Sequence, residues 1–429
     1  MPGPLELVAL GLAAVAAFAL LEAMIRRTMV GVGVVLTAAA IGTTFPELPN
    51  ASFGGTTVTL MDVLATVLLG GAIARWLRRP PVSLPQWLLI AFSILALFSV
   101  IQGIGDYGFH TAINEFRRYF WFISVALYFS TVKLDGSLLD RIARTWMILA
   151  LVLVGLAILR WGVLAAGLTG GYYGVLGAGG FRVLGSAPTL VIMQGFIFGA
   201  LAWARGDAPA WIRRLTPVFL ATVVLMQHRS VWAGLLVTVT LIVLMERRVA
   251  HRLLPIMLLA VVLVGAFSLI VLDDQAADLP GELAESAAYR GTWEWRVDGW
   301  YVLIAEGPEG TEVLTGQPFG GGWERDMDGR SVSFHPHNFY VETYLRTGLA
   351  GLGLLAGLYA VLLWRLRAIA QPHGSPYPTA LLFLLVSHLV HFIPYAPYPE
   401  QGLILGLAIC AASAQPSRDR DPPREKASA

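Results

Sequence analysis

Arginine is the residue type of this sequence best suited to bind an anion. A guanidinium group binds phosphate through two parallel hydrogen bonds, which the point charge of lysine does not reproduce. Ten arginines lie at the ends of apolar segments or in the adjoining loops, on the side opposite to most other basic residues. They are Arg117, Arg118, Arg160, Arg182, Arg229, Arg290, Arg296, Arg325, Arg330 and Arg346. They indicate phosphate recognition; the alternative, anchoring at a membrane surface or pairing with loop carboxylates, fits Arg182 and Arg229 least because few acids are near them.

His337 is the residue whose position best suits proton transfer. It directly precedes Asn338, which can cap the N-terminus of the apolar helix that follows. Imidazole titrates near neutral pH, so His337 can take a proton from a hydroxyl group. The alternative is a histidine that hydrogen-bonds the neighbouring backbone. His335 lies two residues earlier and is a secondary candidate.

A metal site is a competing interpretation of the histidines. His388 and His391 are three residues apart in an apolar segment and so share one helix face. Together with His335 and His337 they would supply four imidazole ligands. Neither an HExxH spacing nor a carboxylate second shell accompanies them, so we expect no metal and favour packing inside a helix bundle.

The elements that must position these residues are membrane spans. The chain has 429 residues, of which 56% are hydrophobic and 14% are charged. A soluble domain has about 25% charged residues. A net charge of +2 argues against a nucleic-acid partner, and the single cysteine excludes a disulfide framework.

Hydrophobicity predicts an all-α, polytopic transmembrane bundle of about 12–13 spans. We assign 1–272 to about ten spans, 273–338 to one large external loop, 339–414 to the C-terminal spans and 415–429 to a disordered cytoplasmic tail. The predicted spans lie near 5–25, 29–43, 58–75, 85–104, 117–132, 145–160, 186–204, 215–227, 231–246, 253–272, 339–364, 378–395 and 400–414.

Basic residues predict the orientation of these spans. Most of the 30 Lys and Arg residues fall in one alternating set of loops and in the C-terminal tail. The positive-inside rule assigns that side, and hence the C-terminus, to the cytoplasm. The N-terminus faces outward if all thirteen spans are real, and inward if one early span is not.

The large external loop is rich in aromatic residues and is therefore expected to fold. It contains a helix-like stretch over 295–304, together with short helices elsewhere. A turn with three consecutive glycines follows Phe319, and such a turn lets the backbone approach a ligand closely. A phosphate-binding nest at this turn is one interpretation.

Four motifs, spread over about residues 180–365, resemble those of the O-antigen ligase and polymerase superfamily. The first pairs Arg182 with Gly185, Ser186 and Pro188, and the second joins Arg229, Ser230 and Trp232, with His228 where the family usually has Ser. The third and fourth are Arg296, Trp300, Pro318, Phe319, Gly320 and Gly322, then His337, Asn338, Tyr340, Gly348 and Gly351. Arg290 with Trp293 is an alternative to Arg296 with Trp300.

The resemblance implies a metal-independent, inverting glycosyltransferase without a cofactor, in a bacterial cytoplasmic membrane with its active site on the external, periplasmic side. The donor would be a glycan linked to undecaprenyl diphosphate, and the acceptor a hydroxyl of a glycan or lipid-linked glycan. Arg182, Arg229 and Arg296 (alternatively Arg290) would bind the donor diphosphate, and His337 would act on the acceptor. Arg118, His335 and His391 are secondary candidates.

Two alternatives stay open at this point. A ligase and a polymerase would share these motifs. A flippase or transporter of lipid-diphosphate-linked glycans would also need arginines facing an anionic headgroup, although such a protein has no evident use for a large aromatic external loop and no internal repeat is visible.

Overall fold

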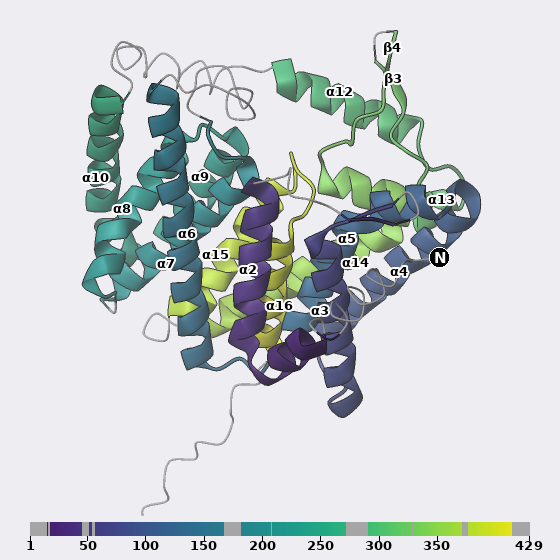
Figure 1. The fold of residues 1–429 in the computed structure, drawn as a ribbon, viewed down its shortest axis with the longest axis horizontal. Helices are drawn as coiled ribbons and strands as arrows, with labels where there is room; N and C mark the ends of the chain where they lie inside the picture. Colours follow the sequence, from purple (N-terminus) through teal and green to yellow (C-terminus); the bar gives the residue numbers. More distant parts are fainter. Residues whose placement is uncertain are drawn as a thin grey trace, which may run out of the picture.

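The computed structural model describes residue 15 and residues 18–44, 51–53, 56–166, 182–206, 208–271, 291–327, 329–370 and 376–413. Figure 1 shows a bundle in which α2, α6 and α10 run roughly parallel, while α12 lies across one end. The first part of the bundle comprises α2 (Thr28–Thr44), α3 (Leu60–Arg78), α4 (Leu84–Tyr107), α5 (Phe109–Phe129), α6 (Gly136–Ala165), α7 (Ser186–Arg205), α8 (Ala210–Leu225), α9 (Arg229–Met245) and α10 (Arg247–Val271). The remaining helices are α12 (Gly291–Ala305), α13 (Glu312–Thr315), α14 (Phe339–Ile369), α15 (Pro376–His391) and α16 (Pro399–Ser413).

Five of the described helices are long and apolar enough to cross a membrane: α3, α4, α6, α7 and α14. Shorter apolar helical stretches lie at Thr28–Gly42, Arg229–Met245, Ala250–Ala266, Pro378–His391 and Pro399–Ser413. The predicted all-α membrane bundle is confirmed at this level, and each predicted span from 29–43 onward overlaps a described helix. The predicted span 5–25 lies largely outside the described residues, as does the tail 415–429.

Glycines let the helices of the bundle approach each other closely. A Cβ at Gly402 of α16 would lie 2.5 Å from the Phe122 carbonyl oxygen of α5. One helical turn later, a Cβ at Gly406 would lie 2.6 Å from the Ala126 carbonyl oxygen. Small residues at this spacing are typical of membrane helices in backbone contact. The centre of the bundle is α7, in which nearly every residue is buried.

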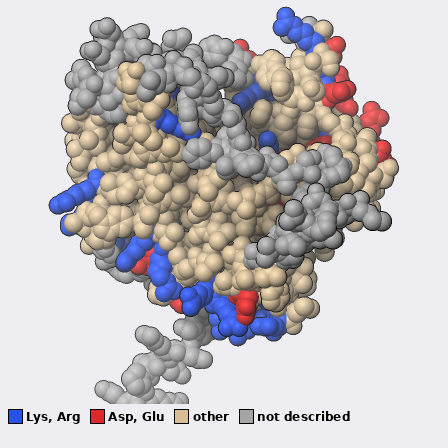
Figure 2. Space-filling model, in the orientation of Figure 1, with Lys and Arg blue, Asp and Glu red and all other residues tan. Residues whose placement is uncertain are grey.

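Basic residues gather at one end of the bundle. Arg205 ends α7 and Arg367 lies in the last turn of α14, so the N-termini of these two helices belong to the opposite end. Figure 2 shows Lys and Arg along the lower edge of the molecule, below a broad band of uncharged surface. The two ends therefore differ in charge as the sequence predicts.

The segment that precedes α14 covers the other end of the bundle. The predicted helix over 295–304 is confirmed as α12, and Asn338 caps α14 by accepting hydrogen bonds from the N–H groups of Tyr340 (2.9 Å) and Val341 (3.1 Å). A two-stranded antiparallel ribbon of β3 (Arg325–Met327) and β4 (Arg330–Val332) was not expected. A second ribbon joins β1 (Ala51–Phe53) to β2 (Thr56–Val58).

The helix that overlaps the fifth predicted span begins before that span. We placed that span near 117–132, whereas α5 begins at Phe109 and contains Glu115. Arg346 of α14 forms an ion pair with Glu115. The ion pair compensates the negative charge of Glu115, so this residue can lie inside the helix.

Candidate active site

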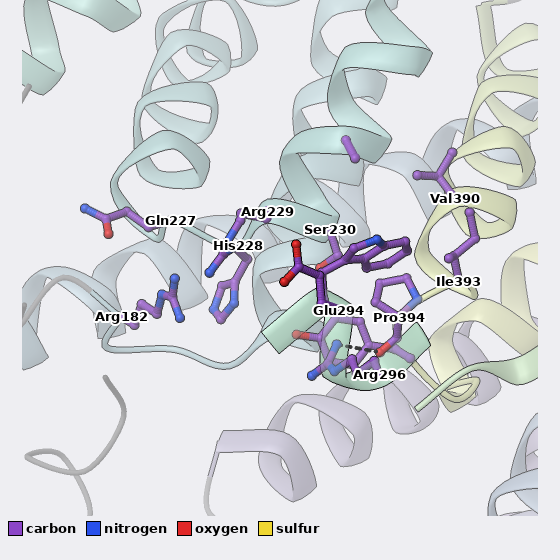
Figure 3. Close-up of a pocket in the computed structure, with 13 residues that line it drawn as sticks. Arg182, Gln227, His228, Arg229, Ser230, Glu294, Arg296, Val390, Ile393 and Pro394 are labelled. Atoms are coloured by element: carbon purple, nitrogen blue, oxygen red, sulfur yellow. Dashed lines mark hydrogen bonds between the residues drawn. The ribbon is translucent and has the colours of Figure 1, made fainter. Parts of the chain in front are cut away.

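Three arginines from distant parts of the sequence line one cavity of about 710 Å³. Arg182 precedes α7, Arg229 begins α9 and Arg296 lies on α12. Figure 3 shows Arg182 and Arg229 on one side of this cavity and Arg296 on the other, with the carboxylate of Glu294 extending into the space between them. The structure thus brings together the three arginines that the sequence predicts to act together.

The turn between α8 and α9 fixes one wall of the cavity. Gln227 adopts a left-handed backbone conformation, with φ of 52°, and His228 caps α9 at its N-terminus. The Nε2–H of His228 donates to the Leu184 carbonyl oxygen at 2.8 Å, which ties this turn to the segment that carries Arg182. Burial lowers the pKa of His228 to about 4, so its ring is neutral at pH 7.

Arg182 and Arg229 lie close enough to repel each other. Burial lowers the pKa of Arg182, and the neighbouring charge of Arg229 lowers it further. Arg229 also stands at the N-terminus of α9, where the helix dipole is positive and a cation is disfavoured. The wall therefore concentrates positive charge, an arrangement that an anion would stabilise.

Arg296 connects the opposite wall to the loop after α15. Its guanidinium donates to the Pro394 carbonyl oxygen at 3.4 Å and lies 5.8 Å from the centroid of the Tyr395 ring. The alternative residue, Arg290, lies outside the described residues, so the choice between the two stays a prediction that rests on the position of Arg296 in the cavity wall.

His337 is not among the residues that line the cavity, and it has a constrained backbone conformation. Its φ is 53°, in the left-handed region that a residue with a side chain rarely adopts. Two contacts hold it there: its N–H donates to Nδ1 of His335 at 3.1 Å, and Trp300 Nε1–H donates to the Pro336 carbonyl oxygen at 2.6 Å.

The electrostatic environment of His337 is cationic. Burial lowers its pKa to about 4, and the charges of Arg296, His335, Arg118 and Arg325 contribute in the same direction. The imidazole is therefore neutral at pH 7 and can accept a proton. This interaction also places the secondary candidate Arg118, from α5, near His337.

His335 is engaged with a buried carboxylate. Its Nε2 lies 2.9 Å from an oxygen of Glu342, which is fully buried in α14, and its Nδ1 accepts the N–H of His337. Its ring also meets Trp323 at a centroid distance of 5.2 Å. These contacts indicate that His335 positions His337.

The four histidines of the metal hypothesis do not form one site. His391 is fully buried and stacks on Tyr395 at 4.8 Å, whereas the His388 side chain meets that of Gln194 at 2.9 Å. Among the described residues, no group of three or more His, Cys, Asp or Glu side chains is arranged to hold a metal ion. His391 instead supports the Tyr395 ring, which lines the cavity.

The interpretation of the glycine-rich turn as a phosphate-binding nest is wrong, because a carboxylate of the protein occupies the turn. Glu115 accepts the N–H groups of Gly320 at 2.8 Å and Gly322 at 3.4 Å. Arg346 completes the cluster with its ion pair to Glu115 and lies 4.2 Å from the centroid of the Trp323 ring. The turn joins the segment before α14 to the bundle.

Several other arginines make contacts within the protein outside the cavity. Arg117 lies 3.2 Å from Asp62, and Arg160 donates to the carbonyl oxygens of Val183 (2.7 Å) and Thr44 (2.9 Å). Arg325 donates to two carbonyl oxygens of its own loop. These residues stabilise the fold around the site.

Sequence reasoning missed Glu294 and Tyr395, both of which line the cavity, and it named Trp293, a third lining residue, only as the partner of Arg290. The signal for Glu294 was its position two residues before Arg296, directly before the stretch predicted to be helical. No protein-family model matches this chain, and no curated protein matches it either. The arrangement of the residues themselves is therefore what supports a function.

Proposed function

We propose that the protein is an inverting glycosyltransferase that moves a glycan from a lipid-linked diphosphate, such as undecaprenyl diphosphate, to an acceptor hydroxyl. The observation that carries this proposal is the convergence of Arg182, Arg229 and Arg296 on one cavity. The charge of Arg296 also acts on the neutral imidazole of His337. The site lies at one end of an apolar helix bundle, which suits a donor held in the membrane by its lipid.

The proposed reaction is a single displacement. The acceptor oxygen forms a bond to the anomeric carbon on the face opposite the diphosphate, and the bond from that carbon to the diphosphate oxygen breaks. The acceptor proton passes to the imidazole of His337, and the electron pair leaves with the lipid diphosphate. The three guanidinium groups stabilise the negative charge that develops on the leaving group.

Donor binding would also prepare His337 for its role. Cationic neighbours lower the pKa of the free imidazole, and Arg296 is one of them. A bound diphosphate offsets that positive field, so it raises the pKa and makes the imidazole a stronger base when substrate is present.

The sidedness that we propose follows from α7 and α14. Each carries a basic C-terminal turn and presents its N-terminus to the site. The positive-inside rule assigns the basic end to the cytoplasm, which puts the active site on the external face of a bacterial cytoplasmic membrane and the C-terminus inside.

The test is transfer by the purified protein in liposomes that contain a lipid-diphosphate-linked oligosaccharide and an acceptor. We expect His337→Ala to abolish transfer. Arg229→Lys and Arg296→Lys keep the charge but lose the planar fork, and we expect a loss of about 10²–10³ in rate. Arg330→Lys, on the exposed ribbon strand β4, is the matched control and should be unaffected.

Activity close to wild type in His337→Ala would overturn its proposed role. Movement of the donor across the bilayer without a new glycosidic bond would instead identify a flippase or transporter. A new bond on a lipid acceptor would indicate a ligase, and growth of the donor glycan a polymerase.

A further inference from the structure

The cavity has a second wall whose chemistry differs from that of an anion site. Trp293 and Glu294 lie on α12, close to Arg296 in the sequence, and both line the cavity. We propose that Trp293 and Glu294 bind the sugar directly attached to the donor diphosphate, and that this sugar is uncharged. This inference rests on the function proposed above and names the substrate group that the site selects.

Trp293 offers an exposed but rigid aromatic surface. It is 47% exposed although it borders a cavity. Trp300 braces it edge to face, with ring centroids 5.3 Å apart and planes at 89°. A ring that is held in place while it stays partly exposed suits stacking against the apolar face of a sugar, because little conformational entropy is lost on binding.

Glu294 is difficult to reconcile with a cavity that binds only phosphate. Figure 3 shows its carboxylate extending from α12 into the same space as Arg229 and Arg296. A carboxylate there would repel a diphosphate that filled the whole cavity. It is well suited to accept hydrogen bonds from sugar hydroxyls or an acetamido N–H group, because an ionised carboxylate has two acceptor oxygens and no donor.

The two walls together match a ligand with an anionic part and a hydroxylated part. The phosphates lie toward the guanidinium groups of Arg182, Arg229 and Arg296, and the adjacent sugar lies toward Trp293 and Glu294. A uronic acid in this position would put its own carboxylate near Glu294 and be disfavoured. The expected class is therefore a neutral hexose or N-acetylhexosamine.

Contacts from this wall also reach His337. Trp293 packs on Trp300, and Trp300 donates a hydrogen bond to the carbonyl of Pro336, the residue before His337. The sugar subsite and the proposed base are thereby held in one fixed relation. This arrangement orients the anomeric carbon with respect to the acceptor that His337 serves.

The test compares binding of two probes to the full-length protein in nanodiscs: undecaprenyl diphosphate, and the same lipid diphosphate carrying one N-acetylhexosamine. For Trp293→Ala and Glu294→Gln we expect the preference for the glycosylated probe over the sugar-free one to fall about tenfold. Binding of the sugar-free probe should be unchanged in Trp293→Ala and tighter in Glu294→Gln, because the latter removes a negative charge.

The same helix supplies matched controls. Trp295 faces Arg325, and Asp298 is exposed on α12 away from the cavity lining. Trp295→Ala and Asp298→Asn should keep the wild-type preference. An unchanged preference in both Trp293→Ala and Glu294→Gln, or an equal loss for both probes, would overturn the sugar subsite. Wild-type protein that binds neither probe would instead overturn the proposed function.

Discussion

Replacement of Glu115 by Gln should destabilise the fold strongly. The Glu115 carboxylate pairs with Arg346 and accepts the Gly320 N–H at 2.8 Å. The side chains of the ion pair are 9% and 2% exposed, so the substitution would leave a desolvated guanidinium without its counter-charge. Removal of one partner of a buried ion pair costs about 3–5 kcal/mol. We therefore expect that decrease in the free energy of unfolding.

The assay is unfolding of the purified protein by SDS titration in mixed micelles. Asp140→Asn is the control, because Asp140 pairs with Arg144 at 2.7 Å on the surface, with side chains 30% and 55% exposed. That pair should contribute less than about 1 kcal/mol. A second variant, Glu115→Gln with Arg346→Met, should recover part of the loss because it leaves no unpaired buried charge.

Two results would refute this reasoning. If Glu115→Gln costs no more than the surface control, the carboxylate does not hold the glycine-rich turn. If instead Glu115→Gln makes the protein bind the sugar-free lipid diphosphate more tightly, the turn is a phosphate site that Glu115 merely blocks. The two outcomes are measured on the same preparation.

Three further predictions concern the chemistry of transfer. The pKa of His337 is lowered to about 4. We therefore expect kcat/KM to stay constant as the pH falls from 8 to 5 and to decrease only below pH 5. A pH–rate profile that bends near the ordinary imidazole pKa of about 6.5 would contradict this prediction. Arg118→Gln removes one neighbouring cation and should move the bend to higher pH. Activity should survive exhaustive chelation, because the arginines stabilise the leaving group; loss on chelation with rescue by a divalent ion would argue against this mechanism.

Local patterns in the sequence were sufficient for the helices and for part of the site. The apolar segments predicted the spans, and α12 was visible as a helix-like stretch over 295–304. Asn338 before an apolar run predicted a cap, because an Asn side chain satisfies the free N–H groups of a helix start. Arg182 and Arg229 stood out because few acids lie near them in the sequence, and both line the cavity.

Contacts between distant residues could not be read from those patterns. Arg346 lies 231 residues from Glu115, and nothing local marks either as the partner of the other. For this reason, a phosphate-binding nest was one interpretation of the glycine-rich turn. His228 and Glu294 are similar cases, since the first acquires its role from the Leu184 carbonyl and the second from the position of α12 over the cavity.

The residues that line the cavity belong to segments that are synthesised at different times. Arg182 and Arg229 belong to the middle of the chain, Arg296 follows, and Pro394 and Tyr395 come after α15. A nascent chain that ends before α15 lacks the carbonyl that Arg296 contacts and the ring that closes the cavity. The cavity is therefore complete only once α15 and the loop that follows it have been synthesised.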